Sequence, residues 1–146
     1  LDDFKMPILT TMIKRKVLLK HSFDKTYNII GDFDLFVKIS LKEKIFSIQE
    51  PLAFYRIHES NMTTNKISLN IEELEKWLSK NRNKKYFKNY NFYNLEKIIK
   101  SLKIKKICIS GNIFQFFSEF FKKPVNLLNL KYIFFLIMPK YIIKKF

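Results

Sequence analysis

The chain contains very little glycine, cysteine or alanine. Of its 146 residues, two are Gly and one is Cys, and Ala53 is the single Ala. Because Gly31 and Gly111 are far apart, the chain has no glycine-rich loop to cradle phosphate groups through backbone N–H donors. The lone Cys108 excludes an internal disulfide and a cysteine-based zinc site. Its apolar neighbours predict a buried thiol.

Acidic residues are also scarce, and the imbalance is uneven. The chain has 28 Lys and Arg against 13 Asp and Glu, a net charge of +15. Residues 1–65 carry 10 basic and 8 acidic residues, whereas residues 66–146 carry 18 and 5. The abundance of Lys, Asn, Ile, Phe and Tyr is typical of AT-rich codons, which accounts for part of the excess. The remainder predicts an anionic membrane surface as a partner of the C-terminal half.

Long hydrophobic runs are missing. The longest apolar run near the C-terminus covers residues 132–138 and is flanked by Lys131 and Lys140. A membrane-spanning helix needs about 20 such residues, so this run favours a core helix or an interfacial helix. No secretory signal opens the chain. We therefore expect a cytoplasmic protein, peripheral at the inner membrane. We interpret the start at Leu1, rather than at Met, as that of a C-terminal fragment.

The first 65 residues predict helices and strands together. Hydrophobic spacing indicates a short basic helix over residues 13–20 and a second helix from about 33 to 42, with Asp32 as its N-cap. β-Branched and aromatic residues predict strands over residues 44–49 and 52–57. The polar run that follows, up to Lys66, predicts a domain boundary.

Residues 66–146 predict helices only. A capping box from Asn70 to Glu73 is expected to open a helix whose buried face includes Leu74, Trp77 and Leu78. Further helices are predicted over residues 95–110, 113–121 and 127–138, with Gly111 closing the first. We therefore divide the chain into residues 1–65, with helices and strands together, and residues 66–146, as a basic helical extension.

Two pairs of residues carry potential chemistry. Asp32 and Asp34 fall at a helix start, where an acid serves as a cap or favours the helix dipole, and where it can also act as a general base. Arg56 and His58 alternate along a predicted strand, so they share one side and suit a diphosphate or a metal–diphosphate. The structural alternative is an Arg56 ion pair with a nearby Glu and a surface His.

The order of these motifs is informative. Three blocks follow one another, Phe23-Asp24, Gly31-Asp32-Phe33-Asp34-Leu35 and Glu50-Pro51-Leu52-Ala53-Phe54-Tyr55-Arg56-Ile57-His58, with Asn61 after them. This order resembles the C-terminal half of the inverting family 2 glycosyltransferases, over about residues 6–64. The resemblance implies an α/β fold, in which the C-terminal part of a GT-A (Rossmann-like) domain precedes an all-helical tail.

The resemblance also implies an activity and a set of site residues. The enzyme would transfer a sugar, with inversion, from a nucleoside diphosphate sugar to a bacterial surface-polysaccharide or lipid-linked acceptor. Asp32 corresponds to the general base. Asp34 and Arg56 would serve the substrate and its diphosphate, and His58 would bind both the diphosphate and a divalent Mg²⁺ or Mn²⁺.

Three departures from the family pattern are visible. Gly31 replaces an acid, Lys38 replaces an Arg, and the donor-binding half with its D-x-D metal motif is absent from this sequence. The alternative is therefore a catalytically incomplete module that binds a membrane surface. Nucleic acid is not expected as a partner, because the aromatic residues are not interleaved with Arg as on an RNA-binding sheet.

Overall fold

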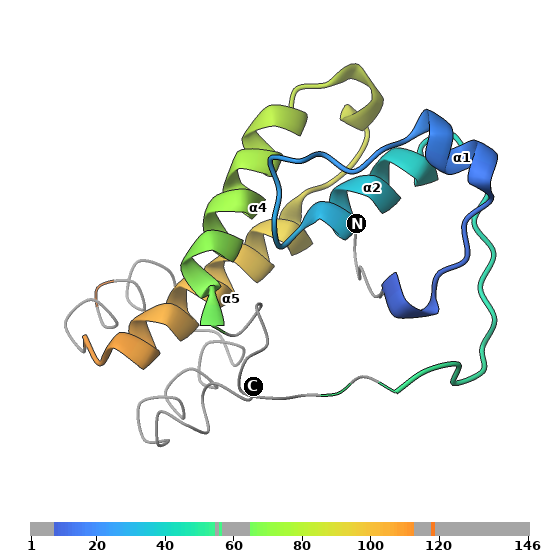
Figure 1. Ribbon diagram of the computed structural model, residues 1–146. Helices are drawn as coiled ribbons and strands as arrows, with labels where there is room; N and C mark the ends of the chain where they lie inside the picture. The colour runs from blue at the N-terminus through green and yellow to red at the C-terminus, as the bar shows by residue number, and fades with distance from the viewer. Residues whose placement is uncertain (1–7, 55, 57–64, 113–117, 119–146) are drawn as a thin grey trace.

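The part of the chain that the computed structural model describes is built from helices (Figure 1). Residues 8–54, 56, 65–112 and 118 are described. The elements, in chain order, are η1 (Ile8–Thr10), α1 (Arg15–Lys20), α2 (Gly31–Ser40), α4 (Ile67–Asn81), η2 (Lys85–Phe87) and α5 (Tyr93–Ser110).

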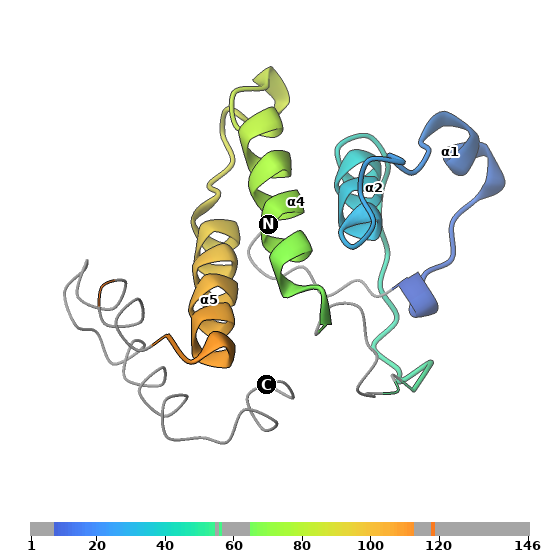
Figure 2. The same cartoon turned by 60° about the vertical axis from the view of Figure 1, so that its left-hand side comes forward.

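Helix α2 is the central element of the core. Figure 2 shows it between α1 on one side and the α4–α5 pair on the other. Phe33 and Val37 lie in the same buried cluster as Trp77 of α4. Residues on other sides of α2 pack against Val17 of α1, namely Leu35, Phe36 and Ile39. The dense apolar pattern of this helix is thus explained by burial on more than one side.

Helices α4 and α5 pack side by side and run in opposite directions (Figures 1 and 2). Ile71 and Leu74 of α4 share the core with Leu95 and Ile99 of α5. Helix α5 ends at Gly111, whose φ of 75° is left-handed and whose N–H donates to the carbonyl of Ile107 at 3.1 Å. A residue without Cβ adopts this conformation at little cost, so the predicted C-terminal glycine is confirmed.

The predicted α/β fold is wrong. Among the described residues there is no strand, and no part of a GT-A or Rossmann-like sheet is present. Residues 44–54, which cover one predicted strand and the start of the other, have no regular structure, and all of their side chains are exposed. A strand must pair its backbone groups with a neighbour, and composition cannot supply that neighbour. Phe46 and Phe54 consequently remain 89% and 103% exposed.

Two predicted helix starts are also wrong. The N-cap of α2 is Ile30, so Asp32 lies inside the first turn rather than at the cap. Helix α4 begins at Ile67, which places Asn70 within the helix and leaves no capping box. The helices predicted over residues 113–121 and 127–138 lie outside the described residues.

Three further features bear on the interpretation of the chain. Helices α2 and α4 share one core, although they lie on opposite sides of the boundary predicted after residue 65. In the described part of the chain, no helix is both long enough and apolar enough to cross a membrane. Cys108 is buried, as predicted, and burial raises the pKa of its thiol.

Candidate functional site

The start of helix α2 is held by a buried carboxylate from α4. Glu73 Oε1 accepts the backbone N–H of Asn28 at 2.8 Å. Its Oε2 accepts the N–H of Ile29 at 2.9 Å and that of Ile30 at 3.1 Å. These donors belong to the residues that lead into α2, so Glu73 fixes both the approach and the orientation of the helix that carries Asp32 and Asp34.

The environment of Glu73 favours its charged form. Burial raises the pKa of Glu73, but the hydrogen bonds from Asn28, Ile29 and Ile30 outweigh it and leave the pKa below its ordinary value of 4.5. The side chain is only 4% exposed. A carboxylate with several backbone donors is the usual way in which a buried charge is tolerated.

The substitution Glu73→Gln is expected to lower the free energy of unfolding by about 2–3 kcal/mol at neutral pH. One of the two acceptor oxygens becomes an NH₂ group, which cannot accept a backbone N–H whether it faces Asn28 or the pair Ile29 and Ile30. Urea denaturation followed by circular dichroism measures the loss. The exposed neighbour provides a matched control, since Glu72→Gln is expected to stay within about 0.5 kcal/mol of the wild type.

The loss from Glu73→Gln should also depend on pH in a defined direction. The pKa of Glu73 in the folded protein lies below its ordinary value of 4.5. The carboxylate therefore stabilises the folded state fully at pH values above 4.5. Its contribution is lost as the pH falls through the folded pKa. The difference between the wild type and the variant should therefore shrink in acid. A difference that grows in acid would contradict the proposed ionised state.

Asp34 is a second buried carboxylate, and it links α2 to α4. It is 4% exposed. Its Oδ1 accepts the indole N–H of Trp77 at 2.9 Å, and its Oδ2 pairs with Lys38 Nζ at 2.5 Å, one turn along the same helix. Lys38 replaces the Arg of the glycosyltransferase pattern. Its ammonium forms an ion pair with Asp34.

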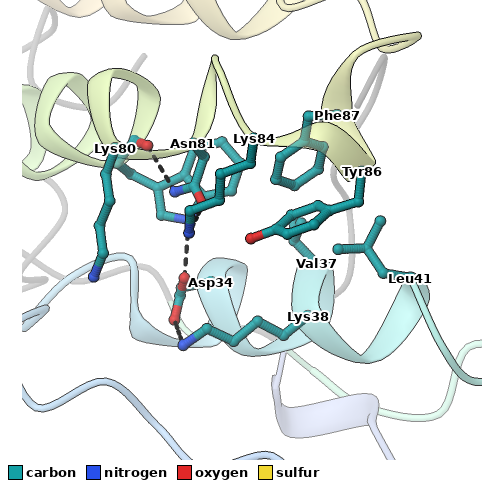
Figure 3. Close-up of a pocket in the computed structure, with 10 residues that line it drawn as sticks. Asp34, Val37, Lys38, Leu41, Lys80, Asn81, Lys84, Tyr86 and Phe87 are labelled. Atoms are coloured by element: carbon teal, nitrogen blue, oxygen red, sulfur yellow. Dashed lines mark hydrogen bonds and ion pairs between the residues drawn. The ribbon is translucent and has the colours of Figure 1, made fainter.

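A small pocket lies beside Asp34, between α2 and the end of α4 (Figure 3). Its volume is about 40 Å³. Lys38, Lys80 and Lys84 line it together with Asn81 and Tyr86. A water molecule needs roughly 10–15 Å³ of such space, whereas ligand sites usually measure about 300–1,000 Å³. The pocket therefore suits water or one small anionic group, and not a nucleoside diphosphate sugar.

The cations around this pocket already have partners. Lys84 Nζ donates to Asn81 Oδ1 at 2.8 Å and lies 5.6 Å from the ring centre of Tyr86. Lys80 pairs with Asp24 at 3.4 Å. The Thr26 hydroxyl and N–H donate to Asp24 and lower its pKa to about 2. These contacts describe a structural polar cluster at one edge of the core.

The predicted site residues occupy different environments. Asp32 is half-buried in the first turn of α2, and its Oδ1 accepts the N–H of Phe33 at 2.7 Å. Asp34, in contrast, points into the core toward Trp77. Arg56 is exposed and belongs to no helix or strand, while His58 lies outside the described residues. The described geometry thus brings Asp34 into the polar cluster and does not bring Arg56 into it.

The described residues do not fit the metal that the resemblance implies. No group of three His, Cys, Asp or Glu side chains in this part of the chain could hold a metal ion. The two buried carboxylates already have partners: Asp34 accepts the indole N–H of Trp77 and pairs with the Lys38 ammonium, and Glu73 accepts backbone N–H donors.

The buried role of Glu73 is not predicted from the sequence, in which this residue is interpreted as part of a capping box. A signal was nevertheless present. Glu73 lies four residues before Trp77 and next to Leu74, so it falls on the apolar face of its helix. An acid on such a face is buried only when donors surround it, which indicates a tertiary partner.

Comparison with protein-family models, with curated proteins and with solved structures found no match.

Proposed function

We propose that the chain supplies the acceptor side of an inverting glycosyltransferase related to family 2, with Asp32 as the general base. The observation that carries the proposal is the order of the three sequence blocks, which end at Asp24, at Leu35 and at His58. The exposure of Asp32 supports it. Of the two acids in the first turn of α2, Asp32 is the one that solvent reaches, whereas Asp34 is buried.

The chemistry needs few groups. In a single displacement, the base removes the proton of an acceptor hydroxyl while the oxygen attacks the anomeric carbon and the nucleoside diphosphate leaves. A carboxylate on a rigid helix suits the first task, because its position is set by packing rather than by a loop. Glu73 contributes by orienting that helix and is a positioning residue in this proposal.

We do not assign binding of the sugar nucleotide to the pocket beside Asp34. The pocket beside Asp34 holds only about 40 Å³, which is too little for a nucleotide. We propose that the sugar nucleotide is bound by a donor-binding half joined to this chain in the complete polypeptide. Arg56 and His58 are proposed to meet its diphosphate, and the divalent Mg²⁺ or Mn²⁺ is assigned to that half.

The test uses the polypeptide encoded by the complete reading frame. It is incubated with UDP-, GDP- and dTDP-hexoses, Mn²⁺ or Mg²⁺, and a lipid extract of the source cells as acceptor. We expect release of nucleoside diphosphate from one donor only when the extract is present, and a product with inverted anomeric configuration by NMR. Retention of configuration, or no acceptor-dependent release from any donor, would reject the assignment.

A further inference from the structure

Helix α1 presents an outer side that combines apolar side chains with cations. Its inner side is anchored by Val17, which is buried against α2. Leu19 follows two residues later, about 200° around the helix, and therefore points away from the core. It is 75% exposed. Met12, just before the helix, is 98% exposed, and Leu18 is 40% exposed.

Only basic charges accompany these apolar side chains. Four exposed cations occur within seven residues, namely Lys14, Arg15, Lys16 and Lys20. No Asp or Glu occurs between Asp3 and Asp24. The ion pairs that link described residues involve none of these four cations, since their basic partners are Lys38, Lys80, Arg82 and Lys103. We call the seven residues Met12, Lys14, Arg15, Lys16, Leu18, Leu19 and Lys20 the α1 surface.

We propose that the α1 surface docks on an anionic lipid bilayer. Met12 and Leu19 would enter the boundary between headgroups and acyl chains, while the cations contact the lipid phosphates. Long Lys and Arg side chains suit this arrangement, because their methylene stems lie along the apolar layer while the charged ends reach the headgroups. Each such cation adds to the attraction of a negatively charged membrane.

The charge pattern determines this choice of partner. The positive charge of the α1 surface complements the negative potential of anionic lipid, and the segment between Asp3 and Asp24 contains no acid. A single-stranded nucleic acid would match the charge but prefers aromatic platforms on which bases stack, whereas the exposed apolar residues here are Met and Leu. The proposal does not rest on glycosyl transfer, and it concerns a different region from the basic C-terminal half.

The test measures binding of the full chain to vesicles at about 0.15 M salt, where the Debye length is about 8 Å. Vesicles of phosphatidylcholine with phosphatidylglycerol are compared with vesicles of phosphatidylcholine alone. The triple variant Lys14→Gln, Arg15→Gln, Lys16→Gln is expected to weaken partitioning into the anionic vesicles on the order of a hundredfold, since each cation contributes about fivefold. The neutral vesicles should bind neither protein.

A matched control removes the same charge from another surface. Lys85, Lys88 and Lys97 are exposed and lie outside α1, so replacing all three with Gln should change partitioning by less than about tenfold. Equal losses in the two triple variants would overturn the proposal and assign binding to overall charge. Binding of the wild type that does not exceed its binding to neutral vesicles would also overturn it.

The apolar contribution has its own control. Met12→Gln with Leu19→Gln should weaken binding by about tenfold, whereas Ile98→Gln on α5, whose side chain is 45% exposed, should not. A (dT) oligonucleotide is titrated in parallel. If the α1 triple variant loses affinity for the oligonucleotide but keeps its affinity for vesicles, the surface belongs to nucleic acid and the lipid proposal is wrong.

Discussion

Replacement of Trp77 with Ala is expected to lower the free energy of unfolding by about 3–5 kcal/mol. Trp77 is 1% exposed, and its ring packs edge-on against Phe33 at 4.8 Å, Phe87 at 5.7 Å and Phe92 at 6.4 Å between ring centres. Truncation leaves a cavity among these rings and removes the N–H donor of buried Asp34. Small domains have only about 5–15 kcal/mol of stability, so the loss is severe.

The variant Trp77→Phe separates packing from hydrogen bonding at this position, and Tyr93→Ala is a control at an exposed ring. Trp77→Phe retains an aromatic ring but removes the N–H. It should cost about 1–3 kcal/mol, because Lys38 is then the one side chain among the described residues that still pairs with Asp34. Tyr93→Ala removes a ring that is 62% exposed and should change stability by less than about 0.5 kcal/mol.

The measurement is urea denaturation followed by far-ultraviolet circular dichroism, because Trp77 is the single Trp of the chain and its fluorescence is lost with the substitution. A loss below about 1 kcal/mol for Trp77→Ala would mean that the α2, α4 and α5 core is not organised around this side chain.

Helices were predictable from the sequence where local signals suffice. Helix α5 was expected over residues 95–110 with a closing glycine, and it spans Tyr93–Ser110 before Gly111. Its hydrogen bonds lie within the segment, so periodicity and a C-terminal glycine specify it. The strands expected near Phe46 and Phe54 depend on pairing with residues elsewhere. Residues 44–54 are therefore exposed and form no strand, in spite of their favourable composition.

The candidate site depended even more on contacts between distant residues. The carboxylate of Asp34 accepts a hydrogen bond from Trp77, 43 residues later in the chain. The carboxylate of Glu73 accepts one from the backbone of Asn28, 45 residues earlier. Spacing in one sequence identifies an acid at a helix start, but it does not identify the donor that faces it. Spacing therefore does not predict that Asp32 is half-buried whereas Asp34 is part of the core.

Under the proposed function, in which Asp32 is the general base, the substitution Asp32→Asn is expected to lower the turnover of sugar transfer by about 10²–10⁴-fold. Asn retains a carbonyl oxygen that can accept the N–H of Phe33, which Asp32 Oδ1 accepts at 2.7 Å. The first turn of α2 should therefore persist. The amide cannot take a proton from the acceptor hydroxyl. The loss of turnover should therefore appear in kcat, while the binding of the nucleotide donor is unchanged.

The control is Glu72→Gln, which removes one exposed acid from α4 and should leave turnover within about twofold of the wild type. Urea denaturation of both variants establishes that folding is intact. Turnover of Asp32→Asn within about threefold of the wild type, with an unchanged unfolding midpoint, would show that Asp32 is not the base. If the loss appears in KM alone, Asp32 contributes to substrate binding rather than to proton removal.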